Sequence, residues 1–367
     1  MAWVERYVRA DADGAGDGTT DANSGATGSW TLDQAIAGCA AGQRVNVKNG
    51  SYSYAAVKTF AIDGTASNPI WWRGFNTAIG DLDSAIVSTN FPQWFLTGAA
   101  NYWNLVGTSN WFSNINWKSE ITTAARGTVT VGDIDQRIWN CRMEGTAADV
   151  DCTAVTVNTA GDNVIVRNCY LKATSSAPCF NAPSSAIVTI ADCVTDGGLQ
   201  GILIGTAGSI AINNIVNNPA GAGIKITASL GLVIGNSVYS AGADGIEFSV
   251  ASSALIMNNI ITDSVGYGIN NSAGTSANMR LINNLYFNNT SGTINNIFES
   301  YETGNQSDAA SPFTNAGGND FSILSTSLAK ANGFPGAFLD ATQTGYMDIG
   351  AVQRKESGGG ALIMRIP

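Results

Sequence analysis

The sequence contains no histidine among its 367 residues. Without an imidazole, Ser-His and Cys-His catalysis and most zinc or redox-metal sites are excluded. Charged residues are also scarce, at 13% of the chain compared with about 25% in a typical soluble domain. Any chemistry must therefore use carboxylates, Lys, Arg, Tyr or a bound hard cation.

Positive charge and long apolar runs are missing as well. The chain has 18 Lys and Arg residues against 28 Asp and Glu, a net charge of −10, and no basic block. Phosphate binding needs clustered cations, so we expect neither a nucleic-acid partner nor binding to an anionic membrane surface. No apolar run approaches the roughly 18 residues of a spanning helix, and the first residues lack the pattern of a secretory signal. We expect no membrane span and no signal peptide.

What the sequence does contain is glycine, 42 residues, and a repeated pattern. A Gly-Ile pair recurs at Gly201, Gly223, Gly245 and Gly268, spaced by 22, 22 and 23 residues, and each copy continues into an apolar run that ends at Asn. The runs are β-branched and too short for helices. Repeats of this kind bury an apolar face only by stacking, which predicts a solenoid of parallel strands.

This pattern resembles the right-handed parallel β-helix of the pectate-lyase-like superfamily, over about residues 45–300. The resemblance implies an all-β fold, with residues 1–44 forming an N-terminal segment and a short capping helix. Thr31 and Gln34 form a capping box for that helix. Residues 301–356 are expected to close the solenoid, and residues 357–367 to form a Gly-rich tether and an extended apolar tail.

Stacked coils turn equivalent positions into columns, and one column is rich in asparagine. Asn tolerates the left-handed backbone of a tight turn, and its amide can donate and accept along the stack. We predict one structural ladder made of Asn140, Asn168, Asp192, Asn214, Asn236, Asn259 and Asn284. In the next column, Cys141, Cys169 and Cys193 align with the aliphatic residues of later coils, which predicts buried, unpaired thiols.

Two carboxylates in a turn column are candidates for acid–base catalysis. Asp149 and Asp196 align with Asp263 and are two coils apart. The strand spacing gives a separation of about 9.6 Å, near the upper limit for the carboxylate pair of inverting glycosidases. The alternative is structural, since turn chemistry alone favours Asp, Asn, Ser and Thr in such a column.

A second candidate group lies at outward positions of later coils. Lys225 and Glu247 occupy the same position in neighbouring coils, and Asp244 is close to Glu247 in sequence. The pair is explained either as an exposed ion pair or as a catalytic acid with a cationic helper.

The N-terminal loop carries oxygen ligands at alternate positions. Asp11, Asp13, Asp17 and Asp21 lie among glycines, as in loops that bind a hard cation such as Ca²⁺. The EF-hand pattern is not matched, because Ala22 stands where the final Glu would be. A solvated acidic loop is the alternative, and no other cofactor is expected.

Seven of the nine tryptophans fall within residues 71–139. Aromatic residues at strand spacing are explained by the core, by a subunit contact or by stacking on sugars. The last residues form an apolar segment behind a Gly-rich tether, which predicts a docking peptide. Its apolar attachment residues are Leu362, Ile363, Met364 and Ile366.

These features lead to one main functional prediction and two alternatives. The main prediction is a structural or adhesive component of a phage virion, a capsid decoration or tail spike, because phage proteins of this kind resemble the same architecture. It would be a homotrimer in the virion, attached through its tail to a capsid or tail protein, with surface glycans as further ligands. The first alternative is a polysaccharide lyase or glycoside hydrolase acting through carboxylates. The second is a secreted surface protein whose leader was removed.

Overall fold

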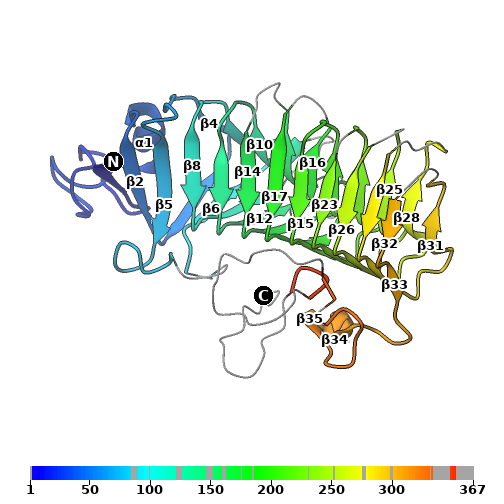
Figure 1. Cartoon of the computed structure of the whole chain (residues 1–367). Helices are drawn as coiled ribbons and strands as arrows, with labels where there is room; N and C mark the ends of the chain where they lie inside the picture. Colours follow the sequence, from blue (N-terminus) through cyan, green and yellow to red (C-terminus); the bar gives the residue numbers. More distant parts are fainter. Residues whose placement is uncertain are drawn as a thin grey trace. The chain divides into compact units, whose positions relative to one another are not determined.

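The structure is a computed structural model (Figure 1). The chain divides into two compact units. The first comprises Met1–Ala177 and Ser184–Ala186, and the second Pro178–Pro183 and Ile187–Pro367. The residues that the structure describes are 2–83, 88, 90–98, 100–120, 126–145, 152–158, 163–174, 176–183, 186–229, 231–250, 253–274, 278–297, 301–330, 332–333 and 348–352.

Each unit consists of three parallel sheets, here called A, B and C, to which successive strands contribute in turn. In the first unit, sheet A contains β1 (Val4–Val8), β2 (Gln43–Lys48), β5 (Ile70–Phe75), β8 (Asn110–Ser113), β11 (Arg137–Trp139) and β14 (Val164–Arg167). Sheet B contains β3 (Ser51–Tyr54), β6 (Gln93–Leu96), β9 (Asn116–Ser119), β12 (Arg142–Gly145) and β15 (Tyr170–Ala173). Sheet C contains β4 (Lys58–Phe60), β7 (Trp103–Leu105), β10 (Arg126–Val131) and β13 (Cys152–Val157).

The second unit repeats this order with shorter strands. Its sheet A contains β17 (Val188–Ala191), β20 (Ile210–Ile212), β23 (Leu232–Ile234), β26 (Leu255–Met257), β29 (Arg280–Ile282) and β32 (Tyr301–Thr303). Sheet B contains β18 (Val194–Gly197), β21 (Ile215–Asn217), β24 (Ser237–Tyr239), β27 (Ile260–Thr262), β30 (Leu285–Phe287) and β33 (Gln306–Ser307). Sheet C contains β16 (Phe180–Ala182), β19 (Ile202–Ile204), β22 (Ile224–Ile226), β25 (Ile246–Phe248), β28 (Tyr267–Asn271) and β31 (Gly292–Asn295).

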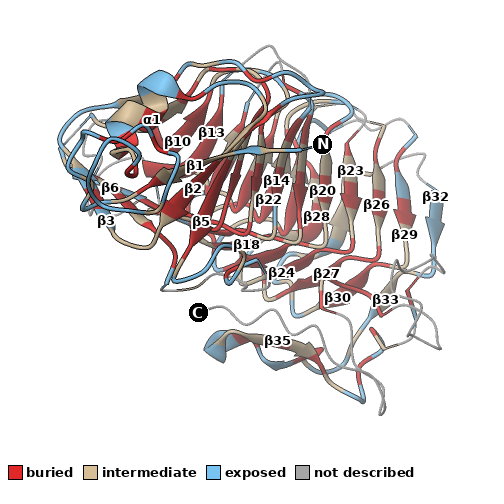
Figure 2. Cartoon of the chain, turned by 90° about the vertical axis from the view of Figure 1, so that its left-hand side faces the viewer, coloured by how far each residue is buried: buried red, intermediate tan, exposed pale blue. Residues whose placement is uncertain are grey.

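The parallel β-solenoid predicted from the repeat is confirmed by the register of these strands. Ile202, Ile224, Ile246 and Ile269 are paired in sequence across sheet C of the second unit, and all four are fully buried. Their stacking gives one aliphatic column of the interior, and Figure 2 shows buried positions along the strands. The interior of the first unit is aromatic instead. Its largest fully buried side chains include Trp72, Trp94, Trp103, Trp117, Phe75, Phe91 and Phe112.

The first unit begins with the predicted capping helix, α1 (Leu32–Gly38). Thr31 and Gln34 form the reciprocal capping box, and Leu32 and Ala35 are fully buried. The helix thus covers apolar surface at the start of the solenoid, where an open sheet edge would otherwise invite aggregation. Among the described residues, no helix has the length and apolarity that a membrane crossing needs.

The predicted asparagine ladder is wrong in one respect, because its seven residues belong to two adjacent columns. Asn140, Asn168 and Asp192 have positive φ angles of 52–53° and share the left-handed turn position with Asn213 and Asn258. The other members are one residue further along the chain and point inward. They are Asn214, Asn236, Asn259 and Asn284, all fully buried, and the column continues at Asn305.

The predicted alignment of the cysteine column is wrong by one residue for the same reason. The Cys193 N–H donates to Asn214 Oδ1, so this cysteine aligns with the buried ladder, whereas Ile215 is in register with Val194. Cys141 and Cys169 likewise follow left-handed turn residues. The inward position after the turn therefore holds either a small thiol or an amide that is satisfied along the stack. All six cysteines are buried thiols, and burial raises the pKa of Cys39 to about 12.

The C-terminal segment of the second unit packs back onto sheet B. It contains β34 (Phe313–Asn315), a short 3₁₀ turn, and β35 (Asp320–Ile323), which pairs antiparallel with β34. Phe321 contacts Tyr239 edge to face, and the Ala351 N–H donates to Ser237 Oγ. The outer surface of sheet B is therefore covered in this unit.

Candidate functional site

The outer surface of sheet C in the second unit carries a column of polar side chains. The column contains Lys225, Glu247, Asn270 and Asn295, in register on consecutive strands from β22 to β31, and the apolar Leu203 on β19 precedes them. Each alternates with a buried residue of the interior column, so the five side chains point outward. A chain-like ligand lying across the strands would meet them one after another.

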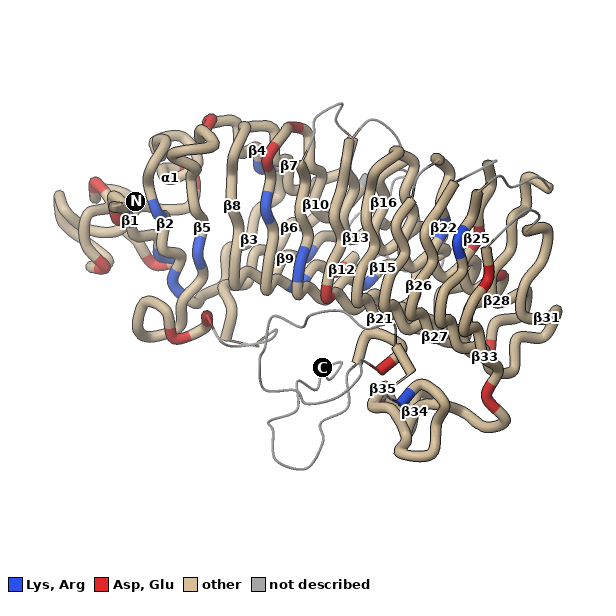
Figure 3. The backbone as a smooth tube through the Cα atoms, viewed as in Figure 1, with Lys and Arg blue, Asp and Glu red and all other residues tan. Residues whose placement is uncertain are grey.

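Lys225 and Glu247 form the predicted ion pair in this column. Figure 3 marks the backbone positions of the charged residues. Lys225 Nζ donates to Glu247 Oε1 at 2.9 Å, and the side chains are 26% and 15% exposed. Ser272 Oγ donates to the same carboxylate oxygen, also at 2.9 Å. The carboxylate is thus held by two donors while both charged groups keep contact with solvent.

Asp244 lies just before β25 and is oriented by two further donors. The Tyr267 N–H donates to its Oδ1 at 2.7 Å, and Asn270 Nδ2 donates to its Oδ2 at 2.8 Å. Asn270 is also the residue in register with Glu247 on the next strand of sheet C. We call Lys225, Glu247, Asp244, Asn270 and Ser272 the sheet C cluster.

Of the other predicted acid–base pair, the structure describes only Asp196, which is not on this face. Asp196 lies on sheet B, where Asn217 Nδ2 donates to it at 3.2 Å. Its alignment with Asp263 was wrong, because Asp196 is in register with Asn217, whereas Asp263 occupies the left-handed turn position after the strand, like Asn218. Asp149 lies outside the described residues.

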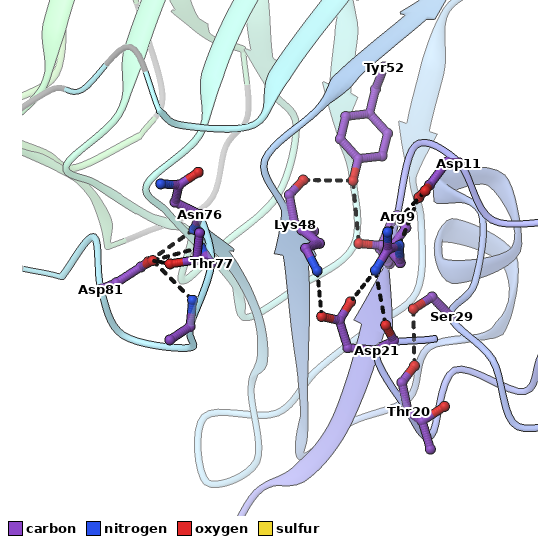
Figure 4. Close-up of polar contacts among 12 residues, drawn as sticks. Arg9, Asp11, Thr20, Asp21, Ser29, Lys48, Tyr52, Asn76, Thr77 and Asp81 are labelled. Atoms are coloured by element: carbon purple, nitrogen blue, oxygen red, sulfur yellow. Dashed lines mark hydrogen bonds and ion pairs between the residues drawn. The ribbon is translucent and has the colours of Figure 1, made fainter. Parts of the chain in front are cut away.

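Two carboxylates of the N-terminal loop, Asp11 and Asp21, pair with nearby cations (Figure 4). Arg9 holds Asp11 through Nε at 2.7 Å, and Lys48 Nζ holds Asp21 at 2.7 Å. The hydrogen bonds from Arg9 lower the pKa of Asp11 below its ordinary value. Asp21 also accepts from Arg9.

The remaining two acids of this loop stabilise local turns. Asp13 accepts from the Ala15 N–H at 2.9 Å, and Asp17 accepts from both the N–H and the hydroxyl of Thr19. Within the residues that the structure describes, no group of three or more acidic or sulfur ligands lies together so that it could hold a metal ion. In the structure the four acids pair with nearby cations or stabilise local turns, and the calcium site stays a prediction.

The tryptophans separate into interior and outer residues, which the sequence left open. Trp72, Trp94, Trp103 and Trp117 are interior. Trp71, Trp111 and Trp139 are half-buried on the outer surface of sheet A in the first unit. The arginines beside them were not among the predicted site residues; they are Arg44, Arg73 and Arg137. The tail residues Leu362, Ile363, Met364 and Ile366 lie outside the described residues.

Comparisons with known proteins agree with this architecture. A family model described as a right handed beta helix region matches residues 153–307. No curated protein matches the sequence significantly. Among solved structures, the chain is similar to pectate lyase Pel9A, with 14% identity, a TM-score of 0.60 and 96% of both chains covered.

Two further solved structures have a comparable fold. The GH136 lacto-N-biosidase from Eubacterium ramulus gives 12% identity and a TM-score of 0.52, over 83% of this chain and 68% of that one. A rhamnogalacturonan lyase gives 14% identity and a TM-score of 0.50, over 84% and 90%. These likenesses establish the right-handed parallel β-helix fold, as predicted from the repeat.

Proposed function

We propose that the protein is a polysaccharide lyase whose reaction takes place at the sheet C cluster, with Glu247 as the base and Lys225 as the cation that assists it. The observation that carries the proposal is the hydrogen-bonded pair of Lys225 and Glu247 on an outward column of a β-helix. The fold supports it, because two of the similar structures are named as lyases that act on polysaccharides.

The chemistry of elimination matches the pair. Glu247 takes the proton from the sugar carbon next to a carboxyl group, the electron pair forms a carbon–carbon double bond, and the bond to the leaving sugar oxygen breaks. That oxygen receives a proton from water. Negative charge develops on the carboxyl group during this step, and a nearby cation stabilises it. An ammonium has three donors, so Lys225 can contact the substrate while one donor holds Glu247.

The remaining members of the cluster position these groups. Ser272 fixes the Glu247 carboxylate through its hydroxyl. Asp244 keeps Asn270 in place by accepting from its amide, and Asn295 Nδ2 donates to Asn270 Oδ1 at 3.1 Å. This polar row continues the column beyond the charged pair and offers amide groups for sugar hydroxyls.

The proposal is tested by incubating the full chain with a panel of carboxylate-bearing and neutral polysaccharides. Elimination produces an unsaturated sugar that absorbs ultraviolet light, whereas hydrolysis produces new reducing ends without that absorbance. We expect the unsaturated product from at least one carboxylate-bearing chain. Reducing ends without it would assign the cluster to hydrolysis instead, and no cleavage of any member would overturn the proposal.

The virion role stays a prediction beside this proposal. It includes the homotrimer, the capsid or tail partner and the location in a phage particle. It depends on attachment through residues 357–367, which lie outside the described residues. A truncation experiment described below tests it independently of catalysis.

A further inference from the structure

Sheet A of the first unit carries a regular row of arginine and tryptophan on its outer surface. Arg44, Trp71, Trp111 and Arg137 are in register on the consecutive strands β2, β5, β8 and β11. All four are half-buried. The residues that follow them in the chain point into the interior and are almost completely buried. These are Val45, Trp72, Phe112 and Ile138.

Two more indoles complete the group. Trp3 packs edge to face on Trp71 and Trp111, with ring centroids 5.6 and 6.2 Å apart. Trp139 contacts the same two rings at 5.6 and 6.2 Å. We call Trp3, Trp71, Trp111 and Trp139 the outer tryptophan cluster. Because the interior has its own aromatic residues, the solenoid core does not account for these four.

The cluster is held in a fixed arrangement by polar contacts. Trp71 Nε1 donates to Ser113 Oγ at 2.9 Å. The guanidinium of Arg44 lies 5.2 Å and that of Arg73 lies 5.0 Å from the centre of the Trp71 ring, and Arg137 lies 4.6 Å from that of Trp111. Rings fixed in this way lose little conformational entropy when a ligand binds.

The arginines bring little net charge to this surface, because each pairs with a carboxylate. Their partners are Glu5 for Arg44, Asp83 for Arg73 and Asp135 for Arg137. The surface therefore combines indole rings with hydrogen-bond donors and is close to electrically neutral. Its members repeat at the strand spacing of about 4.8 Å, along the direction in which the coils stack.

We propose that the outer tryptophan cluster binds a glycan chain that lies along sheet A, through stacking on neutral sugar faces. An indole presents a flat apolar surface, and the arginine donors beside it can bond hydroxyl groups. A protein partner is the alternative occupant, because tryptophan and arginine are also enriched at protein interfaces, and the self-association readout below distinguishes the two. The choice of a glycan as the ligand rests on the proposed lyase function. The surface itself belongs to the first unit, whereas the sheet C cluster belongs to the second.

Binding is measured with the full chain carrying Glu247→Gln, so that the ligand is not consumed, against the same polysaccharide panel. The double variant Trp71→Ala/Trp111→Ala should bind at least about tenfold more weakly, as expected for two lost aromatic contacts. Tyr301→Ala is the matched control, because Tyr301 is 61% exposed on β32, and it should bind like the parent. Binding should change little with salt, since the arginines are already paired.

Three outcomes would overturn the inference. The double variant could bind as tightly as its parent, or the parent could bind no polysaccharide at all, or the double variant could lose self-association while its glycan binding is unchanged. Trp111→Phe, which keeps an aromatic ring, separates lost stacking from lost folding, because it should bind nearly as well as the parent. In the chain with Glu247 intact, the double variant should still cleave at saturating substrate, so a failure of this surface is distinguishable from a failure of the lyase proposal.

Discussion

Replacing Asn236 by alanine tests the buried ladder at its centre. Asn236 Oδ1 accepts from the N–H and the Nδ2 of Asn214, at 2.9 and 3.0 Å. Its Nδ2 donates to Asn259 Oδ1 and to the Ala211 carbonyl, both at 3.0 Å. Alanine removes these four bonds and a fifth, from Asn236 Nδ2 to the Ile234 carbonyl at 3.2 Å. It leaves two donors of Asn214 without an acceptor in a buried position.

The expected cost follows from those lost partners. Each buried donor without an acceptor costs about 1–3 kcal/mol, so the variant should lose about 3–5 kcal/mol of unfolding free energy. For a unit of this size, that corresponds to a fall in the unfolding midpoint of about 6–20 °C. The midpoint is measured by calorimetry and by circular dichroism on the full chain.

Asn213→Gly is the matched control, because it changes the neighbouring column. Asn213 has φ of 55° and is half-buried, and the next coil has Gly235 at the same position with φ of 65°. Glycine adopts this backbone without steric cost, so the control should change stability by less than about 1 kcal/mol. Equal effects of the two substitutions, or a loss below about 1 kcal/mol for Asn236→Ala, would refute the assignment of separate roles.

Three further predictions concern other parts of the chain. The hydrogen bonds from Arg9 to Asp11 and from Thr19 to Asp17 lower the pKa of both acids. The stability that these bonds contribute is therefore present above the ordinary pKa of about 3.9 and is lost as the pH falls below that value. A melting midpoint that stays constant as the pH falls through this range would contradict the prediction. Glu302 takes the inward position of the last sheet A strand, in register with buried Leu281. Glu302→Leu should expose an apolar end of the solenoid and cause end-to-end association, measured by size-exclusion chromatography. A monodisperse variant would argue against a role of Glu302 in preventing this association. Deleting residues 357–367 should abolish trimer formation or incorporation into a particle while the β-helix stays folded, and normal assembly of the truncated chain would remove the basis of the virion prediction.

The fold could be predicted because the repeat encodes it directly. The Gly-Ile pairs fix which isoleucines stack, and Ile202 to Ile269 are paired as the spacing requires. The ladder register could not be fixed in the same way. Left-handed turn residues and buried amides are both asparagine in Asn213-Asn214, and only the hydrogen-bond partners tell them apart.

The candidate site could be predicted in part for the same reason. Lys225 and Glu247 share a repeat position, so their contact follows from the alignment. Asn270 and Ser272 were missed, because their bonds to Asp244 and Glu247 depend on side-chain directions in neighbouring coils. Contacts of the C-terminal segment with sheet B lie outside any repeat, and no periodic signal predicts them.

The tandem Trp71-Trp72 shows a further limit. One ring must point inward and the other outward, and the sequence gives no preference between them. The structure buries Trp72 beside Phe112 and leaves Trp71 outside. The outer tryptophan cluster therefore became visible only once the pleat of β5 was known.

The central claim, proton removal by Glu247, is tested most directly by the initial rate at which the unsaturated product forms from a cleaved polysaccharide. Glu247→Gln keeps the shape of the side chain and removes its basicity, so the rate should fall by about 100-fold or more. Glu144→Gln is the matched control, since Glu144 also pairs with a cation, Arg142, and is similarly exposed at 17%. The account predicts a normal rate for the control; an undiminished rate for Glu247→Gln would contradict it.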